Sequence, residues 1–369
     1  MSQDNYHKID PGADERMKSY LQKIATGPTM SKDLSGSEAE DALTLVLNGT
    51  VSQIRSAVFL VSARMKRETQ EENIGYWRAL DKTALRQEVQ LDTLLQVADP
   101  FDGFNRVPYF GFYAIPVIAA MGLPAYGHSS MPLPPKFGFT FENILTGHYG
   151  LPENTSLDRR GKLIEEFEFG YLGLQQSHPR LDALRELRRE IVKRPMLATW
   201  EKMLMPLQAR RENFLATTYF HRGYETDMLA IAKLSQFSKT VLGNGLESCT
   251  LFGVHKPAKI FIESGEQEPE ERTLKLETMF DDPTAKKIAA AYETLKTETA
   301  TLSTLAEMGE SALKGNPVPA APLISCQAGT LCYLSGQFPD PQTGYNAAAT
   351  ILKSGAAHKN LMRYIEAAR

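Results

Sequence analysis

The sequence predicts an α/β fold, with a small all-helical N-terminal lobe followed by a larger α/β domain whose mostly parallel central sheet is covered by helices. Residues 14–90 show helical periodicity with repeated capping signals, whereas from residue 94 short apolar strands alternate with helices. Such alternation is typical of parallel crossovers and of a sheet buried on both faces. We therefore expect a lobe over 1–90, joined by helices around 180–205, and an α/β domain with a helical tail over 91–369.

Local signals place four short helices in the lobe. Ser35 and Glu38 form a capping-box pattern ahead of the second helix, and Thr69 and Glu72 repeat it ahead of the fourth. Apolar residues at helical spacing over 54–61 predict the third helix, and a Gly-Pro pair at 27–28 ends the first. Short amphipathic helices joined by tight turns predict a bundle.

The α/β domain contains several apolar stretches of strand length. Predicted strands cover residues 94–98, 123–126, 166–169, 214–218, 239–242 and 259–262. A helix is expected over 181–194, and the Glu-rich segment 263–273 is interpreted as an exposed loop. The last hundred or so residues are predicted to be helical, with breaks at 315–317 and 339–341.

Composition narrows the possible classes of function. The 369 residues include 41 Lys and Arg against 44 Asp and Glu, so the net charge of −3 provides no global attraction for nucleic acid. The cysteines Cys249, Cys326 and Cys332 lack metal-site spacing, and we expect them to be buried apolar residues in a reducing compartment. The polar start and the absence of an apolar run of about 18 residues predict a cytoplasmic protein without membrane contact.

Two loops follow neighbouring predicted strands, at the edge where open α/β sheets bind ligands. The first loop spans residues 99–106 and carries Asp99 and Asp102, and the second spans 127–138. The two aspartates together with Glu247 have the oxygen ligands that a magnesium ion prefers. The alternative, which we favour, is that the aspartates cap the following turn.

The order of these elements resembles the anthranilate phosphoribosyltransferase family, with its nucleoside phosphorylase-like glycosyltransferase fold, over nearly the whole chain. Residues 47–52 and 59–69 look like its second and third helices, and 312–315 and 351–357 look like its closing helices. The resemblance implies a pentosyl transferase of tryptophan biosynthesis that uses phosphoribosyl pyrophosphate and Mg²⁺. It also implies a homodimer formed through the lobe, where Phe59, Leu60 and Trp77 are expected to be available for packing.

The motifs of that family are altered here. Its Gly-Thr-Gly-Gly-Asp loop, in which glycines let backbone N–H groups approach the pyrophosphate, reads Asp-Pro-Phe-Asp-Gly at 99–103. Its Lys-His-Gly-Asn loop reads Gly-His-Ser-Ser at 127–130, and its Asp-Glu magnesium pair reads Glu-Ser at 247–248. We therefore expect an altered donor loop, with the acceptor left open.

Carried over residue by residue, the resemblance implies three groups of site residues. The donor or phosphate group comprises Asp102, Gly103, Asn105, Arg106, Lys136 and Gly138. The acceptor group comprises His128, Ser130 and Arg194, and the metal ligand is Glu247. Three of these residues also have a structural interpretation. His128 could be a hydrogen-bonded core histidine, Lys136 a solvated loop cation, and Arg194 a cation at a helix C-terminus.

A second interpretation is a non-catalytic paralogue that binds nucleic acid or a small anionic ligand. Five basic residues on the predicted helix over 181–194 favour it: Arg185, Arg188, Arg189, Lys193 and Arg194. Phosphate contacts from such a face would make binding strongly dependent on salt. The interleaved Glu186 and Glu190 oppose it.

Overall fold

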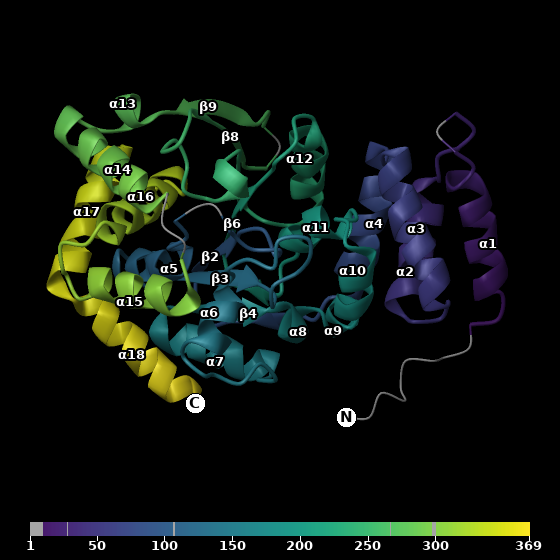
Figure 1. Cartoon of the computed structure of the whole chain (residues 1–369), viewed down its shortest axis with the longest axis horizontal. Helices are drawn as coiled ribbons and strands as arrows, with labels where there is room; N and C mark the ends of the chain where they lie inside the picture. The colour runs from purple at the N-terminus through teal and green to yellow at the C-terminus, as the bar shows by residue number, and fades with distance from the viewer. Residues whose placement is uncertain (1–9, 28, 106–107, 266, 297–299) are drawn as a thin grey trace.

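The computed structural model describes residues 10–27, 29–105, 108–265, 267–296 and 300–369. It contains a helical lobe at one end and a larger α/β part at the other (Figure 1). The helices of the lobe are α1 (Ala13–Ile24), α2 (Gly36–Leu47), α3 (Gln53–Lys66) and α4 (Gln70–Thr83). Both predicted capping boxes are confirmed, at the starts of α2 and α4.

The core of the lobe contains residues that we expected at a dimer surface. Phe59 and Leu60 are fully buried and Trp77 is 4% exposed, so the expectation that they are available for packing with a second subunit is wrong. The apolar side chains that α3 exposes instead are Ile54, Val58 and Met65. The third helix carries apolar residues on two faces, and the sequence pattern does not tell which of them the lobe buries.

A seven-stranded sheet forms the centre of the α/β part. Its strands are β2 (Thr93–Ala98), β3 (Ala125–Ser129), β4 (Phe169–Gly173), β6 (Glu212–Thr218), β7 (Lys239–Gly243), β8 (Ala258–Glu263) and β9 (Glu270–Leu274). In the order β4-β3-β2-β6-β7-β8-β9, the first five strands are parallel, β8 is antiparallel to β7, and β9 is antiparallel to β8. A small separate sheet pairs β1 (Gln87–Glu88) with β5 (Leu207–Gln208). The predicted mostly parallel sheet is thus confirmed.

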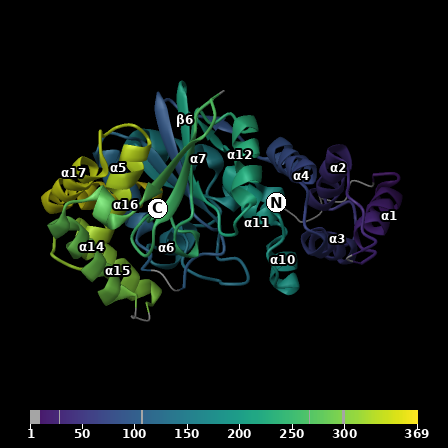
Figure 2. The same cartoon turned by 90° about the horizontal axis from the view of Figure 1, so that it is seen from above.

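Helices cover both faces of this sheet (Figure 2). The helices that follow the lobe in the chain are α5 (Gly111–Ala120), α6 (Phe141–Gly147), α7 (Leu157–Phe167), α8 (Leu174–Ser177), α9 (Pro179–Asp182), α10 (Arg185–Ile191), α11 (Leu197–Trp200), α12 (Tyr224–Leu234), α13 (Leu276–Met279), α14 (Asp282–Leu295), α15 (Leu302–Leu313), α16 (Ala320–Leu334), α17 (Pro341–Ser354) and α18 (Ala356–Ala368). One large core packs α5 and the C-terminal helices against residues such as Val97 and Ala216. A second core joins alternate sheet residues such as Leu215 to the lobe through α11 and α12.

Three predicted elements differ from the structure. Residues 166–167 end helix α7, and the strand begins only at Phe169. The predicted loop over 263–273 contains the edge strand β9, which pairs antiparallel with β8. Its charged side chains are typical of an edge strand, because charges there discourage pairing with another chain. The strand placed at 123–126 runs to Ser129, so His128 lies within the sheet and not in a loop.

The helix predicted over 181–194 is also interrupted. It consists of α9 and α10, and the chain leaves the helix at Val192, whose φ of 60° is left-handed. Arg194 therefore lies in the loop that follows, and the expectation that it ends a helix is wrong.

Two expectations from composition can be compared directly with the structure. All three cysteines are free and buried, as predicted. Among the described residues, no helix is long and apolar enough to cross a membrane.

Candidate functional site

A cleft of about 660 Å³ opens between the lobe and the carboxyl ends of β2, β6 and β7. This volume lies in the range of small-molecule sites, and the edge is the one expected for an open α/β sheet. Charged side chains in its wall are Arg64, Asp102, Lys136, Arg194, Lys202 and Glu247. Uncharged groups include Phe101, Asn105, Thr199, Thr218, Tyr219, Phe220, His221, Tyr224 and Ser248.

The two loops after β2 and β3 are bound to each other. Gly103 has a φ of 76°, and a Cβ there would lie 2.4 Å from the carbonyl of Gly138. A Cβ on Gly138 would in turn lie 2.4 Å from the backbone nitrogen of Phe104. An isolated antiparallel bridge between Phe104 and Phe139 completes the contact. Both glycines are therefore required for the backbones to approach, and neither lines the cleft.

Three backbone N–H groups of the first loop already have partners within the chain. The N–H of Gly103 donates to the carbonyl of Pro100, and that of Phe104 donates to the carbonyl of Phe139. The N–H of Asn105 donates to Oε2 of Glu247 at 3.3 Å, and its side chain donates to the carbonyl of Lys136 at 2.7 Å. These groups are the ones that a phosphate cradle would use. In this conformation the loop holds its own structure together.

An internal carboxylate lies at the start of α5. Asp99 is 2% exposed and its Oδ1 accepts from the N–H of Thr250 at 3.0 Å. Its Oδ2 lies only 3.2 Å from where a Cβ of Gly111, the first residue of α5, would be. Burial raises the pKa of Asp99 to about 6, so the group is mostly ionised at neutral pH. An anion from the chain itself thus occupies the region that the helix dipole favours for negative charge.

The carboxylates in the cleft are paired with cations. Asp102 accepts from Nε of Arg194 at 2.7 Å and lies 3.4 Å from Nζ of Lys136. Glu247 approaches the same Nζ at 3.8 Å. The structure therefore brings together Asp102, Asn105, Lys136, Arg194 and Glu247, five of the residues that the resemblance implied.

A magnesium site of Asp99, Asp102 and Glu247 is not formed. Within the described part of the chain, no three His, Cys, Asp or Glu side chains gather closely enough to hold a metal ion. Asp102 and Glu247 face Lys136, and a cation already occupies the position where a shared metal would neutralise them. The donor set in this conformation does not fit a protein-bound Mg²⁺.

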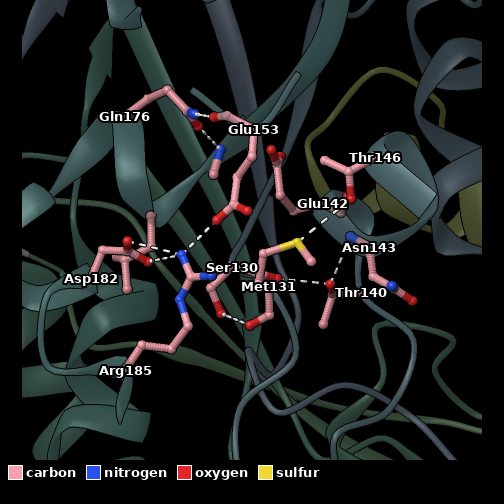
Figure 3. Close-up of polar contacts among 12 residues, drawn as sticks. Ser130, Met131, Thr140, Glu142, Asn143, Thr146, Glu153, Gln176, Asp182 and Arg185 are labelled. Atoms are coloured by element: carbon pink, nitrogen blue, oxygen red, sulfur yellow. Dashed lines mark hydrogen bonds and ion pairs between the residues drawn. The ribbon is translucent and has the colours of Figure 1, made fainter. Parts of the chain in front are cut away.

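His128 and Ser130 do not line the cleft. His128 is completely buried, its Nε2 lies 2.9 Å from Oγ of Ser177, and burial lowers its pKa to about 3. Ser130 donates to the carbonyl of Met131 at 2.8 Å and lies in the network drawn in Figure 3. This placement favours a structural role for both residues. Arg106 lies outside the described residues.

Two of the five basic residues predicted on one helix are held by carboxylates within the chain. Arg188 is 2% exposed and makes a two-pronged ion pair with Glu201, at 2.6 and 3.0 Å. Arg185 points toward Glu153 and Asp182 (Figure 3) and lies 2.6 and 2.7 Å from them. Acidic partners thus neutralise Arg185 and Arg188, two of the residues that favoured nucleic acid.

Two charged residues of the cleft, Arg64 and Lys202, were missed from the sequence. Lys202 follows the helix α11 within the short 3₁₀ helix Glu201–Met203 and is only 5% exposed. Arg64 of α3 donates to the hydroxyl of Tyr224 at 2.9 Å, across the junction between lobe and α12. The Glu-Lys pair at 201–202, inside an otherwise apolar segment, was a usable signal, because buried charges are rare without a partner or a function.

Comparisons with known proteins agree with this architecture. The helical bundle domain of a glycosyl transferase family matches residues 18–84. An anthranilate phosphoribosyltransferase of Methanopyrus kandleri is 23% identical over 94% of this chain and 99% of its own length. The crystal structure of anthranilate phosphoribosyltransferase from Thermus thermophilus has a TM-score of 0.69 at 20% identity, covering 96% of this chain and 99% of that one.

A second solved structure shares the fold to the same extent. It is the anthranilate phosphoribosyltransferase from Saccharomyces cerevisiae in complex with PRPP and Mg, with a TM-score of 0.71 at 17% identity over 95% of this chain and 97% of that one. At these identities the structural likeness establishes the fold, while the sequence matches extend over nearly the full chain. Together the comparisons show that this chain has the fold of anthranilate phosphoribosyltransferases and is similar to them in sequence over nearly its whole length.

Proposed function

We propose that this protein binds an anionic small molecule in the cleft between the lobe and the sheet. The observation that carries the proposal is the charge of the wall, in which Arg64, Lys136, Arg194 and Lys202 outnumber the carboxylates Asp102 and Glu247. Cations in a concave site attract an anion more strongly than they do at an open surface, because the surrounding walls exclude water. Aromatic side chains such as Phe220 and Tyr224 offer contact area for a flat organic group.

This proposal is tested by calorimetric titration of the protein at low and high salt. The three ligands are phosphoribosyl pyrophosphate, inorganic pyrophosphate and anthranilate. We expect saturable binding of at least one of them that weakens as salt increases, since ions screen exposed cations. If none of the three binds at millimolar concentration and low salt, the proposal is wrong.

Phosphoribosyl transfer with an altered donor loop is the second candidate function. It is favoured by the full-length likeness to anthranilate phosphoribosyltransferases and by the yeast neighbour, which holds PRPP and Mg. Against it, three of the loop amides donate to partners within the chain, and Asp99 lies at the start of α5. Product formation from anthranilate and phosphoribosyl pyrophosphate, measured with and without Mg²⁺, distinguishes transfer from binding alone. In this candidate, Mg²⁺ arrives with the pyrophosphate and not on a preformed protein site.

A homodimer remains part of the proposal, with a different surface from the one first expected. Ile54, Val58 and Met65 lie four and seven residues apart along α3, and all three are exposed. This spacing places them on one side of the helix. Sedimentation of an Ile54→Glu, Val58→Glu variant tests it: we expect a monomer where the wild type is a dimer. A wild-type monomer, or an unchanged dimer in the variant, would exclude this surface.

A further inference from the structure

The most unusual charge in the cleft belongs to Lys202. Its side chain is buried, yet the residue lines the cleft, and Nζ donates to the carbonyl of Thr218, another residue of the same wall. An ammonium group has three N–H donors. Among the residues that the structure describes, this carbonyl is its only hydrogen-bond partner, and no carboxylate lies within ion-pair distance.

The neighbouring carboxylates are engaged elsewhere. Glu201 holds Arg188, Asp102 holds Arg194, and Asp99 accepts from the backbone of Thr250. Asp99, Glu201 and Asp102 still favour the charged lysine at longer range, while Lys136 opposes it. Burying a cation without direct pairing is costly, because the hydration that it loses is not replaced.

The cost of burial lowers the pKa of this lysine. Burial lowers the pKa of Lys202 from its ordinary value to about 8, against the raising effect of the three carboxylates. An oxyanion next to Nζ would supply the missing partner and stabilise the ammonium form. Lys136 and Arg194, by contrast, already have carboxylate partners, which a ligand would have to displace.

We propose that Lys202 is the residue that binds the oxyanion group of the ligand, in the wall of the cleft beside Thr218. The inference rests on the proposed function and adds to it where the charged end of the ligand lies. Phosphoryl and carboxylate groups share the chemistry required, which is an oxygen with negative charge that accepts from an ammonium.

Titration of the full chain and its Lys202→Met variant with pyrophosphate and with anthranilate tests the assignment. We expect Lys202→Met to weaken at least one ligand tenfold or more, and which ligand loses affinity identifies the group at Nζ. Lys202→Arg keeps the charge and should bind within about threefold of wild type. Lys162→Met removes an exposed lysine from α7 and should leave affinity unchanged.

The outcomes separate the two proposals. If the wild type binds and Lys202→Met binds equally well, the role of Lys202 is wrong while the proposed function stands. If the wild type binds neither ligand, both are wrong.

A second measurement covers a variant that does not fold. Reductive methylation of the wild type, mapped by mass spectrometry, should slow at Lys202 when a bound ligand is saturating, and not at Lys162. Equal labelling of Lys202 with and without ligand would overturn the assignment.

Discussion

The two walls of the cleft differ in whether their charged side chains are paired with an opposite charge. On one wall, the loops after β2 and β3 bond to each other, and Asp102 and Glu247 pair with Lys136 and Arg194. On the other, Lys202 and Arg64 have no carboxylate within ion-pair distance in the described chain, and their hydrogen bonds go to a carbonyl and a hydroxyl. The charged groups that remain available for a ligand in this cleft are therefore not those of the paired loops.

The largest expected effect on stability comes from the buried ion pair next to Lys202. Arg188 and Glu201 form a buried ion pair that fixes the segment before Lys202 against α10. Arg188→Met leaves Glu201 buried without its partner, and we expect a loss of about 3–5 kcal/mol in the free energy of unfolding. Urea denaturation measures it. The neighbouring Arg189 pairs with Glu186 in an exposed position, so Arg189→Met should cost less than about 1 kcal/mol. Equal losses would show that the buried pair does not support this wall.

The contact between the two loops gives the next largest effect. Gly103→Ala introduces a side chain at a left-handed φ and against the backbone of Gly138, and we expect about 2–4 kcal/mol of destabilisation. Gly150 has a similar φ of 67° with nothing within 4 Å of its Cβ position, so Gly150→Ala reports the conformational cost alone, about 1–2 kcal/mol. Thermal or urea unfolding of both variants separates the two contributions. If the two variants lose the same stability, the close approach of the loops is not rigid.

Releasing the paired wall should strengthen anion binding. Asp102→Asn removes the carboxylate that Arg194 and Lys136 share, so both cations become available to a ligand. We expect roughly tenfold tighter binding of pyrophosphate at low salt, which corresponds to about 1.4 kcal/mol. Calorimetry measures it, and Asp158→Asn, which removes an exposed carboxylate from α7, is the control. Unchanged or weaker binding would mean that the ligand does not contact this wall.

The smallest predicted effect is a pH dependence from the opposite wall. Lys202 is cationic below its pKa of about 8 and loses the charge as the pH rises through that value. Binding of sulfate, whose charge is constant in this range, should therefore weaken about fourfold between roughly pH 7 and pH 8.5. Lys202→Arg stays charged and should show a flat profile. A wild-type profile that is equally flat would argue against an uncompensated lysine in the site.

Local signals in the sequence were enough for much of the fold. The capping boxes of α2 and α4 act within four residues, so the sequence predicts them without tertiary information. The β strands of the buried sheet are apolar on both faces and stand out for the same reason. Strand β9 was missed because it is an exposed edge strand with charged side chains, which resemble those of a loop.

The pairing of the charged residues in the cleft depends on tertiary contacts. The resemblance placed Lys136, Arg194 and Glu247 near one another, but pairing with Asp102 depends on distances that no motif records. Arg188 looked like part of a basic surface because its partner Glu201 lies beyond the end of the helix. Lys202 was overlooked because its role depends on the lack of a carboxylate within ion-pair distance among the described residues, which a sequence does not record.

The most direct test of a ligand cleft that relies on Lys202 is a titration of wild type and Lys202→Met with pyrophosphate in the absence of metal. We expect saturable binding to the wild type without Mg²⁺ and a loss of tenfold or more in the variant. Binding that requires Mg²⁺ and is the same in both proteins would contradict this assignment. It would indicate that the donor loop, and not Lys202, binds the pyrophosphate.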